Sequence, residues 1–212
     1  MARNTSSLVI DGLYDQARDE DIAVAVFYCD FLAQQEQTIA NIMGAILKQL
    51  VGRGEIPGYL REAFQKGQSE FGGGGLPLAD LMRTLKLAIA SLPQVFICLD
   101  ALDECLPTDL QELLESLRDI VQESPRTRIF LTGRPYVGED IRRYFSKAVV
   151  IPISPSQDDV RHYVKMRLDR DPEPDAMNED LQAEIIRVIL EKIADMYVGT
   201  LGLSTLSTVD TY

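Results

Sequence analysis

The sequence predicts an α/β fold built on a parallel sheet, and three observations support that class. Short apolar runs rich in β-branched residues alternate along the chain with longer segments that repeat apolar residues at helical spacing. Strands that alternate with helices imply parallel pairing through right-handed crossover connections. The longest apolar run is continuous rather than alternating, which is typical of a strand covered on both faces. After Pro155 the pattern becomes wholly helical, so we expect a small helical segment to follow the α/β core.

The composition indicates a globular protein with a sizeable core. Of the 212 residues, 46% are hydrophobic and 25% are charged. The formal net charge of −12 at pH 7 argues against non-specific binding to nucleic acid and against docking on anionic membranes. No apolar run approaches the roughly 18 residues of a membrane span, and the first residues lack the apolar core of a signal peptide. We therefore expect no nucleic-acid or membrane partner and a reduced, cytoplasmic setting.

The first third of the chain predicts helices around one buried strand. Residues 5–18 place apolar side chains near helical spacing after a Thr-Ser pair that can cap a helix. Residues 22–29 form the continuous apolar run and predict a strand. Residues 39–51 predict an amphipathic helix, because six apolar side chains line one face. A short helix is expected at 59–65.

Four consecutive glycines at 72–75 interrupt the pattern. A phosphate-binding loop would need a preceding strand and a following lysine, and neither is present. A flexible surface connection is therefore the favoured interpretation.

The middle of the chain predicts three more strands. A helix at 78–91 is followed by the apolar strand at 95–99. A helix at 110–122 then leads to a second apolar strand at 128–131. The remaining elements expected here are a short helix at 139–144 and a strand at 148–151.

The end of the chain predicts two helices, at 157–170 and 180–198, with Ser156 as the cap of the first. The last stretch is rich in Gly, Ser and Thr and loses helical periodicity, so a frayed tail is predicted. The expected organisation is an α/β core over 1–153, a helical lid segment over 154–198 and a tail over 199–212.

Cysteine and histidine carry little functional signal. Cys29, Cys98 and Cys105 lack the spacing of metal ligands. The first two fall in predicted buried strands, where a free thiol behaves as a small hydrophobic group, and we predict neither a zinc site nor a disulfide. His162 lies within a predicted helix without an obvious nucleophile, so a structural role is predicted.

Acidic residues follow the strand at 95–99. Asp100 comes directly after it, and Asp103 and Glu104 come next. An open α/β sheet presents its ligand site at the carboxyl ends of the strands, and Mg²⁺ prefers carboxylate oxygens, water and substrate phosphates. Asp100 would hold the metal ion through water, and Asp103 or Glu104 would orient or deprotonate an attacking water. Alternatively, the acids cap the loop and open the next helix, where negative charge is favoured.

The next strand ends in the run Thr-Gly-Arg-Pro at 132–135. The glycine permits an unusual backbone angle and the proline fixes the exit of the chain. Arg134 would then project beside Asp100, where its planar guanidinium matches phosphate oxygens. The alternative is a surface arginine paired with Glu139 or Asp140.

A nucleoside-triphosphate site also needs a loop that binds the phosphates, and this loop is missing. A Walker A loop reads Gly-x-x-x-x-Gly-Lys-Ser/Thr, and the 212 residues contain no Gly-Lys pair. The two strand ends therefore correspond to the metal-side half of a nucleoside-triphosphate site.

These residues resemble the NACHT-type signal-transducing NTPases of filamentous fungi, which include the heterokaryon-incompatibility NTPases and the nephrocystin-3-like N-terminal domain. The resemblance rests on residues 96–104 as the Walker B strand and 129–135 as the sensor 1 strand, supported by 26–29, 154–164 and 194–197. It implies a P-loop fold of the STAND class, with Mg²⁺ and ATP or GTP as ligands. In that family Asp100 would be the metal-site acid, Asp103 and Glu104 catalytic-water residues, and Arg134 the sensor.

The resemblance also implies that part of the domain lies outside this chain. In the family, Walker A directly precedes the helix that here is 5–18, and further modules follow residue 197. The absent first strand would lie between the strands at 128–131 and 148–151. We therefore expect an open gap there or a sideways shift of the last strand, and a longer parent with effector and repeat domains.

Three functions remain open at this point. The first is an active ATPase or GTPase switch, which in an intact parent would act in fungal non-self recognition. The second is a nucleotide-incompetent fragment or pseudo-NTPase that acts through protein partners or self-association. The third is an unrelated α/β domain whose acids are incidental. The missing phosphate-binding loop favours the second.

Overall fold

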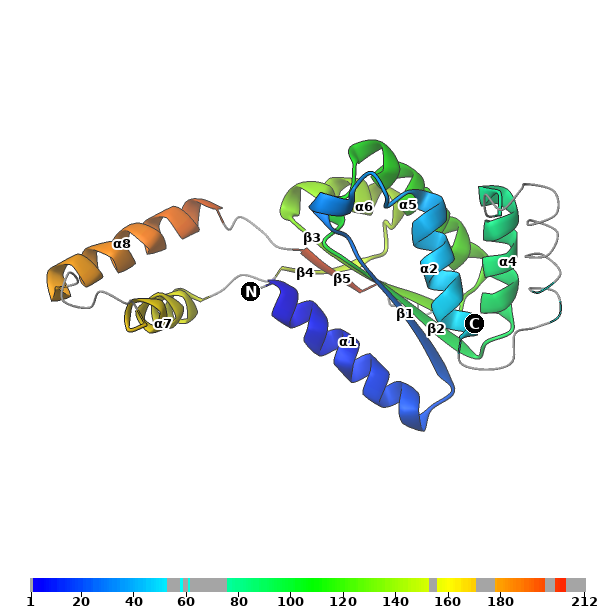
Figure 1. The fold of residues 1–212 in the computed structure, drawn as a ribbon, viewed down its shortest axis with the longest axis horizontal. Helices are drawn as coiled ribbons and strands as arrows, with labels where there is room; N and C mark the ends of the chain where they lie inside the picture. The colour runs from blue at the N-terminus through cyan, green and yellow to red at the C-terminus, as the bar shows by residue number, and fades with distance from the viewer. Residues whose placement is uncertain are drawn as a thin grey trace.

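A computed structural model gives the arrangement of the chain (Figure 1). It describes residues 2–52, 58, 61, 76–152, 156–170, 178–196 and 201–204. The short helix predicted at 59–65 lies outside these residues apart from Arg61, and the four glycines at 72–75 lie outside them entirely.

Within the described residues, five strands form one sheet in the order β1-β2-β3-β5-β4. They are β1 (Ile22–Tyr28), β2 (Gln94–Asp100), β3 (Thr127–Gly133), β4 (Val149–Pro152) and β5 (Leu201–Ser204). The first three strands pair in parallel, as predicted, with Tyr28 opposite Asp100 and Cys98 opposite Phe130. β5 is antiparallel to both β3 and β4, so β4 runs in the same direction as β3. The mixed α/β fold is consistent with a P-loop-like sheet.

The predicted helices of the described residues are confirmed to within three residues at each end. They are α1 (Ala2–Asp19), α2 (Ile39–Val51), α4 (Leu78–Ala90), α5 (Pro107–Glu123), α6 (Gly138–Tyr144), α7 (Gln157–Leu168) and α8 (Glu179–Met196). The sequence did not predict three single 3₁₀ turns, η1 (Phe31–Ala33), η2 (Leu102–Glu104) and η3 (Pro135–Val137). Each of these turns follows the carboxyl end of one parallel strand, so together they build that edge of the sheet.

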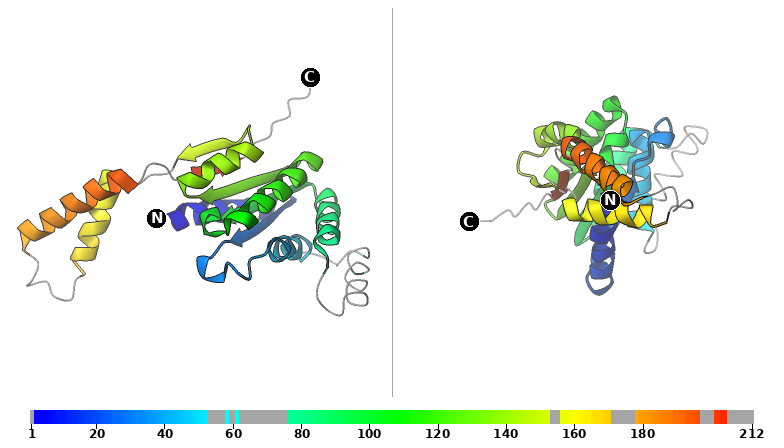
Figure 2. Two further views of the ribbon diagram at one scale, coloured as in Figure 1. Left: turned by 90° about the horizontal axis from the view of Figure 1, so that it is seen from above. Right: turned by 90° about the vertical axis from the view of Figure 1, so that its left-hand side faces the viewer.

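Helices cover the sheet unequally (Figures 1 and 2). The face with the larger core packs against α2, α4, α5 and α6, and the other face packs against α1. Alternate residues of β1 show the two environments, because Ala23 and Ala25 join the larger core while Ile22 and Val24 pack with Ile10 of α1. Burial on both faces explains why this strand is a continuous apolar run.

The helices α7 and α8 pack against each other and stand apart from the sheet (Figure 1). The predicted cap of α7 is confirmed as a capping box. Ser156 Oγ accepts from the N–H of Asp159 at 3.1 Å, and the Asp159 carboxylate accepts from the N–H of Ser156 at 3.0 Å. None of the described helices combines the length and the apolar character needed to cross a bilayer.

β5 fills the position between β3 and β4 that the sequence predicted to be open or closed by a shift of the last strand. Leu203 lies opposite Leu131 on one side and Val150 on the other. The prediction of a frayed tail at 199–212 is therefore wrong for Leu201–Ser204, and the rest of that tail lies outside the described residues. Pairing on both sides satisfies backbone groups that would each cost about 1–3 kcal/mol if buried without partners.

We predict that removal of β5 makes the chain self-associate. A chain ending at residue 198 leaves the inner edges of β3 and β4 without their shared partner, and such edges pair with other chains. A chain ending at residue 204 keeps β5 and serves as the matched control. Light scattering after gel filtration is expected to give a larger mass for the shorter chain, and equal masses would contradict the role assigned to β5.

Candidate functional site

Asp100 is the last residue of β2, and its side chain is held by the neighbouring strand. The residue is 7% exposed. The hydroxyl of Thr132 on β3 donates to Asp100 Oδ1 at 2.5 Å and accepts from the N–H of Ala101 at 3.0 Å. One threonine hydroxyl thus uses its donor and an acceptor site, and it fixes both the carboxylate and the turn that follows it.

The turn after Asp100 is strained. Ala101 has φ 59° and ψ 48°, the left-handed region, and no other non-glycine residue of the described chain has a positive φ. An alanine in this conformation costs about 1–2 kcal/mol. The turn sends Leu102 into the core, where it is fully buried, and brings η2 against the end of β3. Burial of Leu102 and the hydrogen bond from Ala101 to Thr132 hold the strain in place.

Asp103 and Arg134 pair across the ends of β2 and β3. Asp103 Oδ1 accepts from the backbone N–H of Arg134 at 3.1 Å, and Asp103 Oδ2 lies 3.2 Å from Arg134 Nε. The Asp103 side chain is 9% exposed and that of Arg134 is 74% exposed. In the described part of the chain the ion-pair partner of Arg134 is therefore Asp103, rather than Glu139 or Asp140.

Gly133 is required for close packing. A Cβ atom built at this position would lie 2.8 Å from Val137 Cγ2 and 3.6 Å from Asp103 Oδ1. The residue continues β3 and does not adopt a left-handed backbone, so the predicted unusual angle at Gly133 is wrong. The left-handed residue is Ala101, one strand away.

Glu104 braces the loop that follows β1. Its Oε2 accepts from the N–H of Phe31 at 3.0 Å, and its carbonyl oxygen accepts from Gln34 Nε2 at 2.7 Å. The carboxylates of both Asp103 and Glu104 thus accept from backbone N–H groups. Their predicted action on a catalytic water remains a prediction.

The donor set at this edge fits one kind of metal site. Among the described residues, no three His, Cys, Asp or Glu side chains are grouped so that they could hold a metal ion together. Mg²⁺ often uses only one or two carboxylates and completes its shell with water and substrate phosphates. Asp100, oriented by Thr132, fits that role, whereas an all-protein metal cage does not fit these residues.

Two cysteines that the sequence left without a role meet at the same edge. Cys29 directly follows β1, and its N–H donates to the carbonyl oxygen of Asp100 at 2.9 Å. Its Sγ lies 3.1 Å from Sγ of Cys105, the residue after η2. Their shared hydrogen bond lowers the pKa of Cys105 and, together with burial, raises the pKa of Cys29. All three cysteines are free thiols, and burial raises the pKa of Cys98 to about 12.

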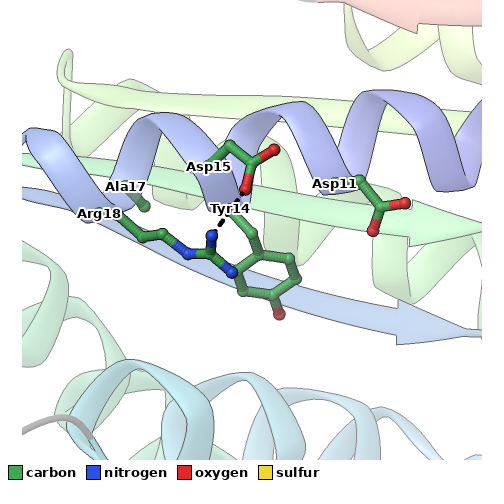
Figure 3. Close-up of a pocket in the computed structure, with 5 residues that line it drawn as sticks. All are labelled: Asp11, Tyr14, Asp15, Ala17 and Arg18. Atoms are coloured by element: carbon green, nitrogen blue, oxygen red, sulfur yellow. Dashed lines mark ion pairs between the residues drawn. The ribbon is translucent and has the colours of Figure 1, made fainter.

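Two surface hollows lie away from these strand ends. One of about 670 Å³ runs along α1 (Figure 3) and is lined by Asp11, Tyr14, Asp15, Ala17 and Arg18. The other, of about 480 Å³, lies between α4 and α5. Neither is lined by the predicted site residues, and His162 is exposed on α7. Asp100, Asp103, Glu104, Thr132 and Arg134 form a polar rim at the carboxyl ends of β2 and β3. This rim is distinct from both hollows.

The sheet with its three parallel strands and the polar rim define a mixed α/β protein with polar side chains clustered at the carboxyl ends of β2 and β3. The family model described as nephrocystin 3, N-terminal, matches residues 5–134, which include β1, β2, β3 and the rim as far as Arg134. The match covers more than half of the chain, and the chain belongs to this family. Searches of curated proteins and of solved structures returned no match.

We predict that Thr132→Val destabilises the fold by about 2 kcal/mol, because it leaves the Asp100 carboxylate and the Ala101 N–H without their partner. Thr127→Val is the matched control on the same strand. Thr127 is also buried, but its hydroxyl has no hydrogen-bond partner in the described structure, so valine there is expected to be neutral or stabilising. Urea unfolding measures both changes, and similar costs for the two variants would contradict the bracing role of Thr132.

We further predict unequal costs for removing the two partners of the Asp103–Arg134 pair. Arg134→Ala is expected to cost below about 1 kcal/mol, because the guanidinium is mostly exposed. Asp103→Ala is expected to cost about 2 kcal/mol, because the backbone N–H of Arg134 also loses its acceptor. The exposed pair of Asp80 and Arg83 gives the comparison for a simple surface ion pair. Equal costs for the two alanine variants in urea unfolding would show that Asp103 acts through the ion pair alone.

Proposed function

We propose that this chain is a NACHT-type nucleotide-binding signalling domain of the STAND class, of the fungal heterokaryon-incompatibility type. In this proposal Asp100 is the Walker B acid and Arg134 is the sensor 1 residue. The observation that carries it is that a buried carboxylate held by Thr132 and an exposed arginine paired with Asp103 lie at the ends of the neighbouring strands β2 and β3. Membership of the nephrocystin 3, N-terminal family supports it.

The position of α1 supports a phosphate-bearing ligand. The helix runs antiparallel to β1 (Figure 1), so it begins at the edge of the sheet where Asp100 lies. The N-terminus of a helix carries partial positive charge and attracts phosphate groups. A guanidinium that is 74% exposed is also free to exchange its carboxylate partner for phosphate oxygens in the same bidentate geometry.

Asp100, Asp103 and Glu104 would have different roles in nucleotide binding and hydrolysis. Asp100, held by Thr132, would position Mg²⁺ through water. The ion, when bound, would neutralise charge on the phosphates. Asp103 and Glu104 are the candidates for orienting a water, and each would first have to release its backbone N–H partner, Arg134 or Phe31. Both carboxylates are thus held away from catalysis in the arrangement described here, which supports an inactive state.

The absence of a Gly-Lys pair from the 212 residues supports inactivity. Charge-assisted hydrogen bonds are each worth about 1.5–3 kcal/mol, and losing three of them removes on the order of 5 kcal/mol. That loss weakens binding by more than roughly a thousandfold, so a micromolar site becomes millimolar. We therefore propose that this chain alone does not hydrolyse ATP or GTP and acts through protein partners or self-association in a cytoplasmic setting.

The helix pair α7 and α8 is the proposed contact surface. It stands apart from the sheet, and Leu181 and Val188 on α8 are large apolar side chains left exposed. In a longer parent with a phosphate-binding loop, nucleotide would close this segment onto the core as an ATP- or GTP-dependent switch. Effector and repeat domains of that parent would carry the signal.

We predict that the purified chain releases no phosphate from ATP or GTP with Mg²⁺ above the level of its Asp100→Asn variant. NMR titration with Mg²⁺ and ADP is expected to give weak, millimolar binding, with shifts at residues 99–104, at residues 132–135 and in the first turn of α1. Arg134→Ala is expected to weaken this binding further, because one phosphate contact is lost. Arg83→Ala, which removes an exposed arginine on α4, is the matched control and should leave it unchanged.

Two outcomes would contradict the proposal in different ways. Turnover that Asp100→Asn abolishes would show an active NTPase and overturn the claim of inactivity. Shifts centred on the α1 hollow, or a complete absence of shifts at millimolar nucleotide, would remove the strand-end site itself and favour an unrelated α/β domain.

A further inference from the structure

The cysteine pair at the sheet edge is independent of any nucleotide. Cys29 is 4% exposed and Cys105 is partly exposed, and their sulfur atoms lie 3.1 Å apart although 76 positions separate them in the chain. A disulfide bond is about 2.05 Å long, so the two sulfurs need to approach by only about 1 Å.

Hydrogen bonds hold the backbone next to Cys29 and next to Cys105. The N–H of Cys29 donates to Asp100 O at 2.9 Å, and Phe31 and Gln34 both donate to Glu104. These bonds join the loop after β1 to the loop that carries η2, directly beside both sulfurs. The fold therefore holds the two backbone segments that carry these thiols next to each other.

We propose that Cys29 and Cys105 form a reversible disulfide that fastens the loop after β1 to the loop after β2. The third cysteine, Cys98, is fully buried on the α1 face of the sheet and takes no part. The family match assigns no such bond.

The oxidant in this proposal is a low-molecular-weight disulfide of the glutathione type. The sulfur of Cys105, the more exposed of the two, attacks that disulfide, forms a mixed disulfide and releases one glutathione. The sulfur of Cys29 then attacks the Cys105 sulfur and releases the second glutathione. The two cysteine sulfurs are oxidised by two electrons in total, the glutathione disulfide is reduced, and the two thiol protons end on the two glutathione molecules.

The bond would lock the segment that carries the candidate site. Asp103 and Glu104 lie within two residues of Cys105, so η2 would be tied covalently to the end of β1. Closing so long a loop also restricts the unfolded chain, and we expect the melting temperature to rise by about 10 °C.

The test uses the full chain in glutathione buffers of increasing oxidised fraction. Mass spectrometry of the intact chain is expected to show the loss of two hydrogen atoms. Peptide mapping should place the bond between Cys29 and Cys105, and excess reduced glutathione should reverse it. The oxidised chain should melt about 10 °C above the reduced chain.

Variants separate the roles of the three cysteines. Cys98→Ala should keep the bond, whereas Cys105→Ala should abolish it. Cys29→Ala should trap glutathione on Cys105, because the second sulfur is gone. The inference is overturned if the unmodified sequence keeps all three thiols in glutathione disulfide, if mapping places the bond on Cys98, or if oxidation fails to raise the melting temperature. Mapping of the unmodified sequence remains decisive even if a variant does not fold.

Discussion

The hydrogen bond between Asp100 and Thr132 is the contact on which the rest of this edge depends. Parallel pairing brings the ends of β2 and β3 together, but it does not fix the side chains that follow. The threonine hydroxyl does so, because it holds the carboxylate and also the N–H of Ala101 in its left-handed turn. That turn buries Leu102, and it is the burial of Leu102 that carries η2 towards β3. This polar contact thus fixes the turn between β2 and η2, on which the positions of Asp103 and Glu104 depend.

The polar rim also brings three negatively charged side chains close together. Asp100, Asp103 and Glu104 lie within five residues, and two like charges about 6 Å apart repel by roughly 3 kcal/mol at an effective dielectric of 20. Each carboxylate instead accepts a hydrogen bond from a different element, Thr132 of β3, the backbone of Arg134 or the loop after β1. The acids thereby act as structural connectors between three neighbouring strand ends.

The sequence predicted the periodic features of this protein and missed those that depend on distant contacts. Strands such as β1 and helices such as α2 follow from local apolar spacing, and Asp100 and Arg134 were placed correctly at strand ends because parallel sheets align those ends. The partner of Arg134, the close packing of Gly133 and the thiol contact of Cys29 with Cys105 involve residues that meet only after folding. β5 escaped prediction because four residues containing a glycine give no periodic signal, and its pairing is wholly long-range.

The antiparallel pairing of β4 with β5 limits where α7 and α8, which lie between these strands in the sequence, can be placed. The chain leaves the sheet at Pro152, passes through α7 and α8, and returns at Leu201, directly opposite Pro152. Neighbouring strands lie about 4.8 Å apart. Pro152, before the helix pair, and Leu201, after it, therefore lie next to each other in the sheet. Because the chain leaves and re-enters the sheet at neighbouring positions, the helix pair is tethered to one place on the sheet, and this limits how far it could move along the molecule.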